Sequence, residues 1–246
     1  MEKDGQEAAL LSEMRSLLVQ QGFPVEKYVD PWLMRFLLAS SMNAAKAAKM
    51  VTKWKKWRDE IAPLGYVPDA EVLSQLEMEK VYLQGISARG HPVVVVKLNK
   101  HVPANDQLLV KKFSTHLMDK IIASSFKDGK EIGNEKCVGI LDMDKLSYKN
   151  VDFRGMTTGF QIFQAYYPQR MEKMYIVGMP KFFVGIWRML SYFLDKSNLD
   201  RVMIVQKGEA NKIFLEEIGE EVLPEEYGGR AKLTSIQDVT VNYPKY

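Results

Sequence analysis

The sequence contains few of the residues that bind metals or form disulfide bonds. Its 246 residues include one cysteine, Cys137, and three histidines. One cysteine excludes a disulfide bond within the chain, a cysteine zinc site and an iron–sulfur cluster. The histidines, His91, His101 and His116, form no H-E-x-x-H or H-x-H pair. We therefore expect them to be surface or structural residues and expect no metal site.

The chain also lacks a strong excess of charge and a long apolar run. With 34 Lys and Arg against 31 Asp and Glu, its formal net charge is +3, which is too small to indicate a nucleic-acid partner. No uncharged stretch is long enough to span a bilayer, and the first residues lack the apolar segment of a secretory signal. We therefore expect a cytoplasmic protein.

The common catalytic motifs are missing as well. The segment 85–90 has the wrong spacing for a G-x-S-x-G nucleophile elbow. Gly129 and Lys130 lack the earlier glycine of a phosphate-binding loop, and no G-x-G-x-x-G follows a strand. We therefore expect no enzymatic activity and no cofactor.

Two candidate chemical groups remain, and each has a structural alternative. Asp142 and Asp144 follow an expected strand and are either a metal-binding or acid–base pair or, as we favour, a loop cap and a solvated carboxylate. Cys137 is either a nucleophile or, as we favour, an unreactive thiol packed inside an apolar strand.

Residues 1–80 show the patterns of helices only. Apolar residues recur there at steps of three and four, and Asp30 and Asn43 are expected helix caps. One face of the helix that follows Asn43 carries the four lysines Lys46, Lys49, Lys53 and Lys56. We favour a solvated face over a contact with an anionic bilayer for this lysine stripe.

Beyond residue 80, expected strands alternate with expected helices. The predicted strands are Val93–Val96, Cys137–Met143, Met174–Val177 and Arg201–Val205. Strands joined in this way by helices predict an α/β fold with a mostly parallel sheet and right-handed crossovers.

The expected helix over 180–194 is too apolar for an ordinary surface helix. Apolar side chains cover nearly its whole circumference, and Lys181 and Arg188 are its only charged residues. Its outer face must therefore meet more protein, a bilayer surface or a bound ligand. At about 22 Å long, it is too short to cross a membrane.

Five motifs in order resemble the CRAL-TRIO lipid-binding family, from about residue 32 to 230. They are Trp32–Leu37 with Asn43–Ala48 and Lys56–Arg58, the strand start Gly90–Val93, the strand segment Ile140–Met143, the segment Tyr166–Met171, which resembles Y-Y-P-E-R, and Leu223–Gly229. Each is weak alone, and together they are specific. The resemblance implies an N-terminal helical region over 1–80 and a lipid-binding domain over 81–246.

The resemblance also implies a function. Members of this family bind one hydrophobic molecule in a deep cavity beneath a mobile lid helix. Here the lid and acyl-chain pocket residues would be Phe182, Phe183, Ile186, Trp187 and Leu190. The ligand would be a phospholipid of the phosphatidylinositol or phosphatidylcholine class, or another hydrophobic molecule. The protein would be a monomer that contacts membranes transiently.

The headgroup site implied by the resemblance departs from the family pattern. Arg170 and Arg201 match cationic residues of phosphoinositide-binding members, and Gln169 replaces a glutamate. Ser40 and Ser41 replace two cations, which favours a neutral or zwitterionic lipid. Cys137 and Gly139 also stand where hydroxyl-bearing residues that contact choline lipids are common. The lipid therefore stays open, and the alternative for Arg170 and Arg201 is surface pairing with Glu172 or Asp200.

Three functional hypotheses follow. The leading one is a non-enzymatic carrier or presenter of lipid. The second is a protein-interaction module that keeps this fold without lipid exchange, in which large side chains would fill the cavity. The third is an enzyme acting on a small molecule, which would need a catalytic constellation that the sequence does not show.

Overall fold

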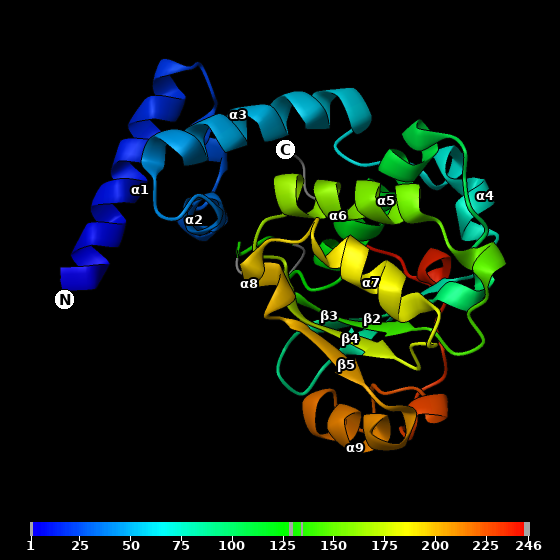
Figure 1. The fold of residues 1–246 in the computed structure, drawn as a ribbon. Coiled ribbons are helices and arrows are strands. Elements are labelled where there is room, and N and C mark those ends of the chain that lie inside the picture. The colour runs from blue at the N-terminus through cyan, green and yellow to red at the C-terminus, as the bar shows by residue number, and fades with distance from the viewer. Residues whose placement is uncertain (1, 128–129, 134, 244–246) are drawn as a thin grey trace.

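The computed structural model describes residues 2–127, 130–133 and 135–243 (Figure 1). Three long helices come first: α1 (Glu2–Gln20), α2 (Asp30–Ala39) and α3 (Ala44–Ile61). The remaining helices are α4 (Leu73–Leu76), α5 (Gln107–Ala123), α6 (Phe153–Tyr166), α7 (Phe183–Ser191), α8 (Lys196–Leu199) and α9 (Lys207–Glu217). The strands are β1 (Val81–Ile86), β2 (Pro92–Lys97), β3 (Cys137–Asp142), β4 (Met171–Val177) and β5 (Val202–Val205).

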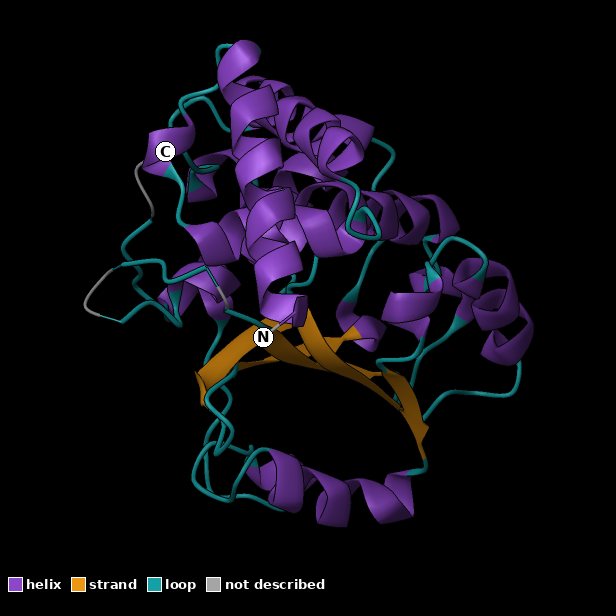
Figure 2. Ribbon diagram, turned by 90° about the vertical axis from the view of Figure 1, so that its left-hand side faces the viewer, coloured by secondary structure: helices purple, strands orange, loops and turns teal. Residues whose placement is uncertain are grey.

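In the described part of the chain, five strands form one sheet in the order β1-β2-β3-β4-β5. The β1–β2 pair is antiparallel, and the other three pairs are parallel. Successive right-handed crossovers in one direction place their helices on the same face of a sheet. Accordingly, α5, α6 and α7 lie on one face and α9 lies on the other (Figures 1 and 2).

The sequence patterns missed one strand and misplaced one cap. Strand β1 was not expected, because four consecutive buried residues and Gly85 hide the alternation of an edge strand. The first turn of α2 includes Asp30, whose carboxylate accepts a hydrogen bond from Arg15 Nε at 2.9 Å and does not cap the helix. The cap at Asn43 is confirmed, since its side chain accepts from Lys46 N at 2.9 Å.

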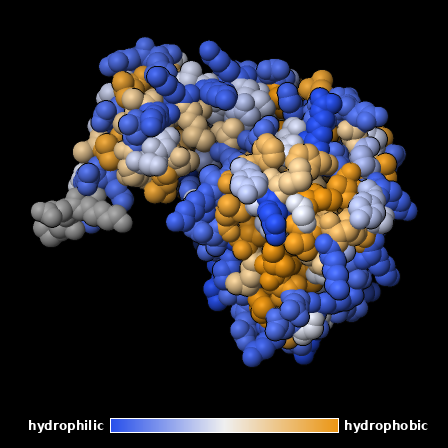
Figure 3. All heavy atoms as spheres, in the orientation of Figure 1, coloured by the Kyte–Doolittle hydropathy of each residue, from blue (hydrophilic) through white to orange (hydrophobic). Residues whose placement is uncertain are grey.

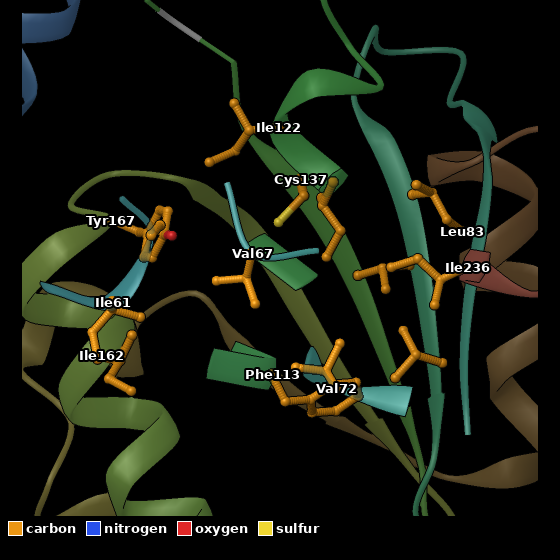
Figure 4. Close-up of a cluster of buried hydrophobic side chains, with 14 of the residues drawn as sticks. Ile61, Val67, Val72, Leu83, Phe113, Ile122, Cys137, Ile162, Tyr167 and Ile236 are labelled. Atoms are coloured by element: carbon orange, nitrogen blue, oxygen red, sulfur yellow. The ribbon is translucent and has the colours of Figure 1, made fainter. Parts of the chain in front are cut away.

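The N-terminal helices share their own apolar core. Its centre is a group of tilted and edge-to-face rings that includes Tyr28, Trp32, Phe36 and Trp54, with centroids 4.5 to 6.4 Å apart. A second core joins the C-terminal half of α3 to the sheet unit. Figure 4 shows Ile61, Phe113, Ile162 and Ile236 converging in this core from distant parts of the chain.

A buried polar network reinforces that junction. Arg58 of α3 donates from Nη1 to both carboxylate oxygens of Asp119 of α5, at 2.9 and 2.7 Å. The Tyr167 hydroxyl, just after α6, donates to Asp119 at 2.8 Å. Burial raises the pKa of Asp119 more than the Arg58 guanidinium lowers it. The network ties three helices together through groups that water barely reaches.

Candidate lipid-binding site

An apolar cavity of about 240 Å³ lies between the sheet and the helices that cover it. Its walls are Val81, Val94, Val96, Ser114, Leu117, Met118, Ile121, Cys137, Leu141, Gly159, Phe160, Ile162, Phe163, Met171, Met174, Ile176, Trp187, Leu194 and Val202. Ser114 is the single hydroxyl among these side chains. A cavity of this composition suits hydrocarbon and offers almost nothing to a polar substrate.

The strands form the floor of the cavity because alternate residues of a strand share one face. Val94 and Val96 of β2 and Met174 and Ile176 of β4 point into it. Gly139 lies between them on β3 and has a spatial role, since a Cβ atom there would stand 2.6 Å from the sulfur of Met174. The missing side chain therefore lets Met174 extend across the neighbouring strand.

Cys137 lies in the wall of this cavity. Burial raises the pKa of its thiol to about 12, so the sulfur is protonated at neutral pH and is a poor nucleophile. The expectation that Cys137 is packed inside the strand is therefore confirmed, and its low reactivity stays a prediction.

Helix α7 covers one side of the cavity. Phe183 and Leu190 are each 1% exposed and pack into an apolar cluster with Met143 and Ile176. Phe182 and Ile186 pack partly buried against the same cluster. Of the five residues expected in the lid and pocket, Trp187 lines the cavity directly. The regular helix is shorter than the expected 180–194 because the chain turns at both ends.

The outer face of α7 is apolar and exposed. The N-terminal helices lie away from it (Figure 1), so they are not the protein that this face was expected to meet. Val184 is 45% exposed, Met189 56% and Tyr192 83%. Tyr148, from the loop after β3, is 72% exposed and its ring lies 4.2 Å from that of Phe182. Figure 3 shows hydrophobic atoms gathered on this face of the molecule.

A second, more polar pocket shares the lining residue Val202 with the apolar cavity, and we name this pocket the polar mouth. The mouth includes Lys136, Glu172 and Arg201. Arg201 donates from Nη1 to the Met171 carbonyl at 2.6 Å and from Nη2 to Gln169 Oε1 at 3.0 Å. Glu172 Oε2 lies 3.8 Å from Arg201 Nη1 and accepts from Lys136 at 2.8 Å, which lowers the pKa of Glu172. Arg201 and Gln169 are thus neighbours, and their headgroup role stays a prediction.

Arg170 points away from this mouth. It is 4% exposed, and its guanidinium donates to Glu135 at 2.9 Å and to Glu131. Arg35 of α2 donates to the carbonyl of Glu135 at 2.7 Å and to that of Gln169 at 2.6 Å. These two arginines hold the segment before β3 against the turn that carries Gln169. The sequence did not reveal the roles of Glu131 and Glu135, because ion-pair partners that are distant in the chain leave no periodic signal.

The segment from Tyr166 to Arg170 is largely a joint between the N-terminal helices and the sheet. Tyr166 stacks on Trp57 of α3 with the ring centroids 4.0 Å apart, and Tyr167 belongs to the Arg58–Asp119 network. The motif residues Trp57 and Arg58, recognised separately in the sequence, are therefore direct partners of this segment.

Ser40 and Ser41 lie in the turn between α2 and α3. Ser41 is exposed and has a φ of 53°. Among the described residues, no hydrogen bond joins either serine to Arg170 or Arg201, and their headgroup role stays a prediction. The stripe Lys46, Lys49, Lys53 and Lys56 is exposed along α3.

Asp142 and Asp144 have structural partners. Asp142 accepts hydrogen bonds from Asp144 N at 2.8 Å and from the Tyr227 hydroxyl at 2.6 Å, so its expected loop-capping role is confirmed. Asp144 lies 3.1 Å from Lys207 Nζ. Within residues 2–127, 130–133 and 135–243, no group of three His, Cys, Asp or Glu side chains is placed to hold a metal ion. Over the same residues, no helix has the length and apolarity needed to cross a membrane.

Comparison with known proteins finds relatives over nearly the whole chain. The profile of the CRAL/TRIO domain matches residues 76–229. CRAL-TRIO domain-containing protein YKL091C of Saccharomyces cerevisiae is 27% identical over 95% of this chain and 80% of its own. SEC14 cytosolic factor of Kluyveromyces lactis is 25% identical over 95% of this chain and 81% of its own.

A plant relative and a solved structure extend this comparison. Phosphatidylinositol/phosphatidylcholine transfer protein SFH13 of Arabidopsis thaliana is 26% identical over 91% of this chain and 38% of its own. The crystal structure of Sfh5 aligns with a TM-score of 0.70 and 18% identity over 98% of this chain and 93% of its own. The mixed α/β fold expected from the sequence is therefore confirmed.

Proposed function

Since this chain belongs to the CRAL/TRIO domain family, we propose that it binds one phospholipid without catalysing a reaction and transfers it between membranes or presents it there. The observation that carries this proposal is the apolar cavity of about 240 Å³, closed on one side by a helix whose outer face is itself apolar. Relatives named for phosphatidylinositol and phosphatidylcholine transfer support the phospholipid class.

The physical need for such a cavity is large. Two acyl chains of about thirty methylenes in total would cost about 25 kcal/mol to expose to water, at about 0.8 kcal/mol each. A carrier must therefore shield them before it leaves the bilayer. An apolar cavity under a movable helix does so, because the same helix can face lipid when open and ligand when closed.

The size of the cavity indicates that α7 moves. Its volume of about 240 Å³ lies below the roughly 300 to 1,000 Å³ of pockets that enclose drug-sized ligands, and a phospholipid is larger still. We infer that this is a closed form and that lipid uptake displaces α7 from the sheet.

For the headgroup we propose the polar mouth around Arg201. A lipid with its tails beside Val202 would place its phosphate near Arg201 and Lys136, which can donate charge-assisted hydrogen bonds. Gln169 supports this site by accepting a hydrogen bond from Arg201. We expect Arg170 to act indirectly by fixing the turn that carries Gln169. The absence of cations at Ser40 and Ser41 favours a zwitterionic lipid over phosphatidylinositol.

The membrane contact would be the outer face of α7 together with Tyr148. This face combines exposed apolar and aromatic side chains with the cations Lys149, Lys181 and Arg188, a combination suited to an anionic bilayer surface. Such contact fits a protein that works in the cytoplasm, as the name of the cytosolic-factor relatives suggests.

Met189→Glu combined with Tyr192→Glu should weaken binding to vesicles that contain phosphatidylserine by at least ten-fold. Both side chains are more than half exposed, so the fold should tolerate the change while two carboxylates oppose insertion into the bilayer. Vesicle sedimentation measures the binding. Val19→Glu, at a 60% exposed position of α1, is the matched control; an equal loss in that variant would contradict the assignment of the docking face.

The function itself is tested by purifying the protein from a eukaryotic host and identifying its co-purified lipid by mass spectrometry. We expect close to one phospholipid per protein and transfer of labelled phosphatidylcholine between vesicles. No lipid, even after incubation with mixed vesicles, would contradict the carrier and favour the interaction module.

A further inference from the structure

We propose that Gln164 is a latch that holds the C-terminal end of the α7 lid closed over the cavity and so sets the rate at which the lid opens. This inference rests on the proposed carrier function for its purpose, but its geometry stands independently. Gln164 lies on the last turn of α6, and its side-chain amide reaches the segment between α7 and α8.

The contacts of Gln164 centre on one residue. Its Nε2 donates to the Phe193 carbonyl at 2.7 Å, and its Oε1 accepts from Asp195 N at 2.6 Å. These two backbone groups belong to the two peptide units that flank Leu194. One side chain thereby fixes both peptide planes on either side of Leu194.

Fixing these two peptide planes positions Leu194, which lines the apolar cavity. Its neighbours are exposed: Tyr192 is 83% and Phe193 41% exposed. Leu190, 1% exposed, is the last deeply buried residue of α7, so beyond it the position of Leu194 depends strongly on the Gln164 amide.

The latch extends into α8. Oε1 of Gln164 also accepts from Asn198 Nδ2 at 3.4 Å. Asp195 in turn caps α8, with its Oδ1 accepting from Asn198 N at 2.8 Å. The whole segment 193–198 is thus bonded to α6, one of the helices that line the cavity.

Helix α7 itself is held by burial near both of its ends, at Phe183 and at Leu190, and the segment after it is held differently. Phe183 is 1% exposed in an apolar cluster, whereas the Phe193 and Asp195 bonds are accessible to solvent. Water can replace an accessible hydrogen bond at small net cost, while extracting a buried phenylalanine is expensive. Opening of the lid should therefore begin in segment 192–198, beyond the buried Leu190.

Gln164→Ala tests the latch, with amide hydrogen exchange of the purified, folded protein as the first measurement. We expect exchange in segment 192–198 to be about ten times faster, with little change in the sheet. Gln164→Glu keeps the acceptor for Asp195 but removes the donor to Phe193. Its exchange rate in segment 192–198 should therefore lie between those of the wild type and Gln164→Ala. The matched control is Gln161→Ala, an exposed position one turn earlier on α6, which should leave the exchange unchanged.

The second measurement is the transfer rate of labelled phosphatidylcholine between phosphatidylcholine vesicles. Gln164→Ala should raise it at least three-fold, since the closed lid opens more often. The latch would be overturned if amide exchange in segment 192–198 did not change. It would also be overturned if exchange became faster throughout the sheet in both Gln164→Ala and Gln164→Glu. If the wild-type chain transfers no lipid while the local exchange behaves as expected, the carrier function fails and the latch stands.

Discussion

Gly159→Phe should abolish lipid binding while the protein stays folded. Gly159 is in the middle of α6 and faces the cavity, where a Cβ atom would meet only Ser114 Oγ, at 3.8 Å. A phenyl ring at this position would extend into the cavity of about 240 Å³. It would occupy the volume that acyl chains need, so we expect at least a ten-fold loss of co-purified phospholipid and of vesicle transfer.

This variant should be less stable than the wild type by about 2.5 kcal/mol at most and should stay folded. A side chain in place of a helical glycine contributes about 0.5–1 kcal/mol, which offsets part of the overpacking cost of about 1–3 kcal/mol. Gly159→Ala is the matched control: it gains the helix contribution, leaves the cavity open and should keep its lipid. Stoichiometric phospholipid in folded Gly159→Phe would show that the lipid binds elsewhere.

Asp119→Ala should lower the free energy of unfolding by about 3–5 kcal/mol. The Arg58 and Asp119 side chains are 6% and 7% exposed. Removing the carboxylate leaves the guanidinium of Arg58 in a poorly solvated place with much less compensation, and the Tyr167 hydroxyl loses its acceptor at 2.8 Å. Urea unfolding followed by circular dichroism measures the change.

The control is a surface ion pair in the same region, between a basic side chain and an aspartate. Lys55 and Asp59 of α3 form an i, i+4 pair with side chains 36% and 64% exposed. Asp59→Ala should change stability by less than about 0.5 kcal/mol, because exposed pairs contribute little. Comparable losses in the two variants would contradict the view that burial makes the Arg58–Asp119 network the strong link between the helices and the sheet.

The headgroup residues show why local patterns locate a site only in part. Gln169 and Arg170 are adjacent in the sequence, yet Gln169 meets Arg201 at the mouth while Arg170 is buried against Glu131 and Glu135. Sequence spacing does not reveal which way a side chain points when the backbone has a positive φ, as at Gln169 with 57°. The division of the chain near residue 80 likewise stays a proposal.

Apart from strand β1, sequence patterns predicted the element types, the mostly parallel sheet and the excess of apolar residues in α7, because these depend on periodicity and composition within single segments. The three-dimensional contacts were needed to show that α7 keeps an exposed outer face, that Leu194 lines the cavity and that Gln164 bonds to the backbone on either side of Leu194. Pairings such as Arg58 with Asp119 were also decided at that level. They depend on contacts between residues far apart in the chain, which are made only when the crossovers bring the helices together on one face of the sheet.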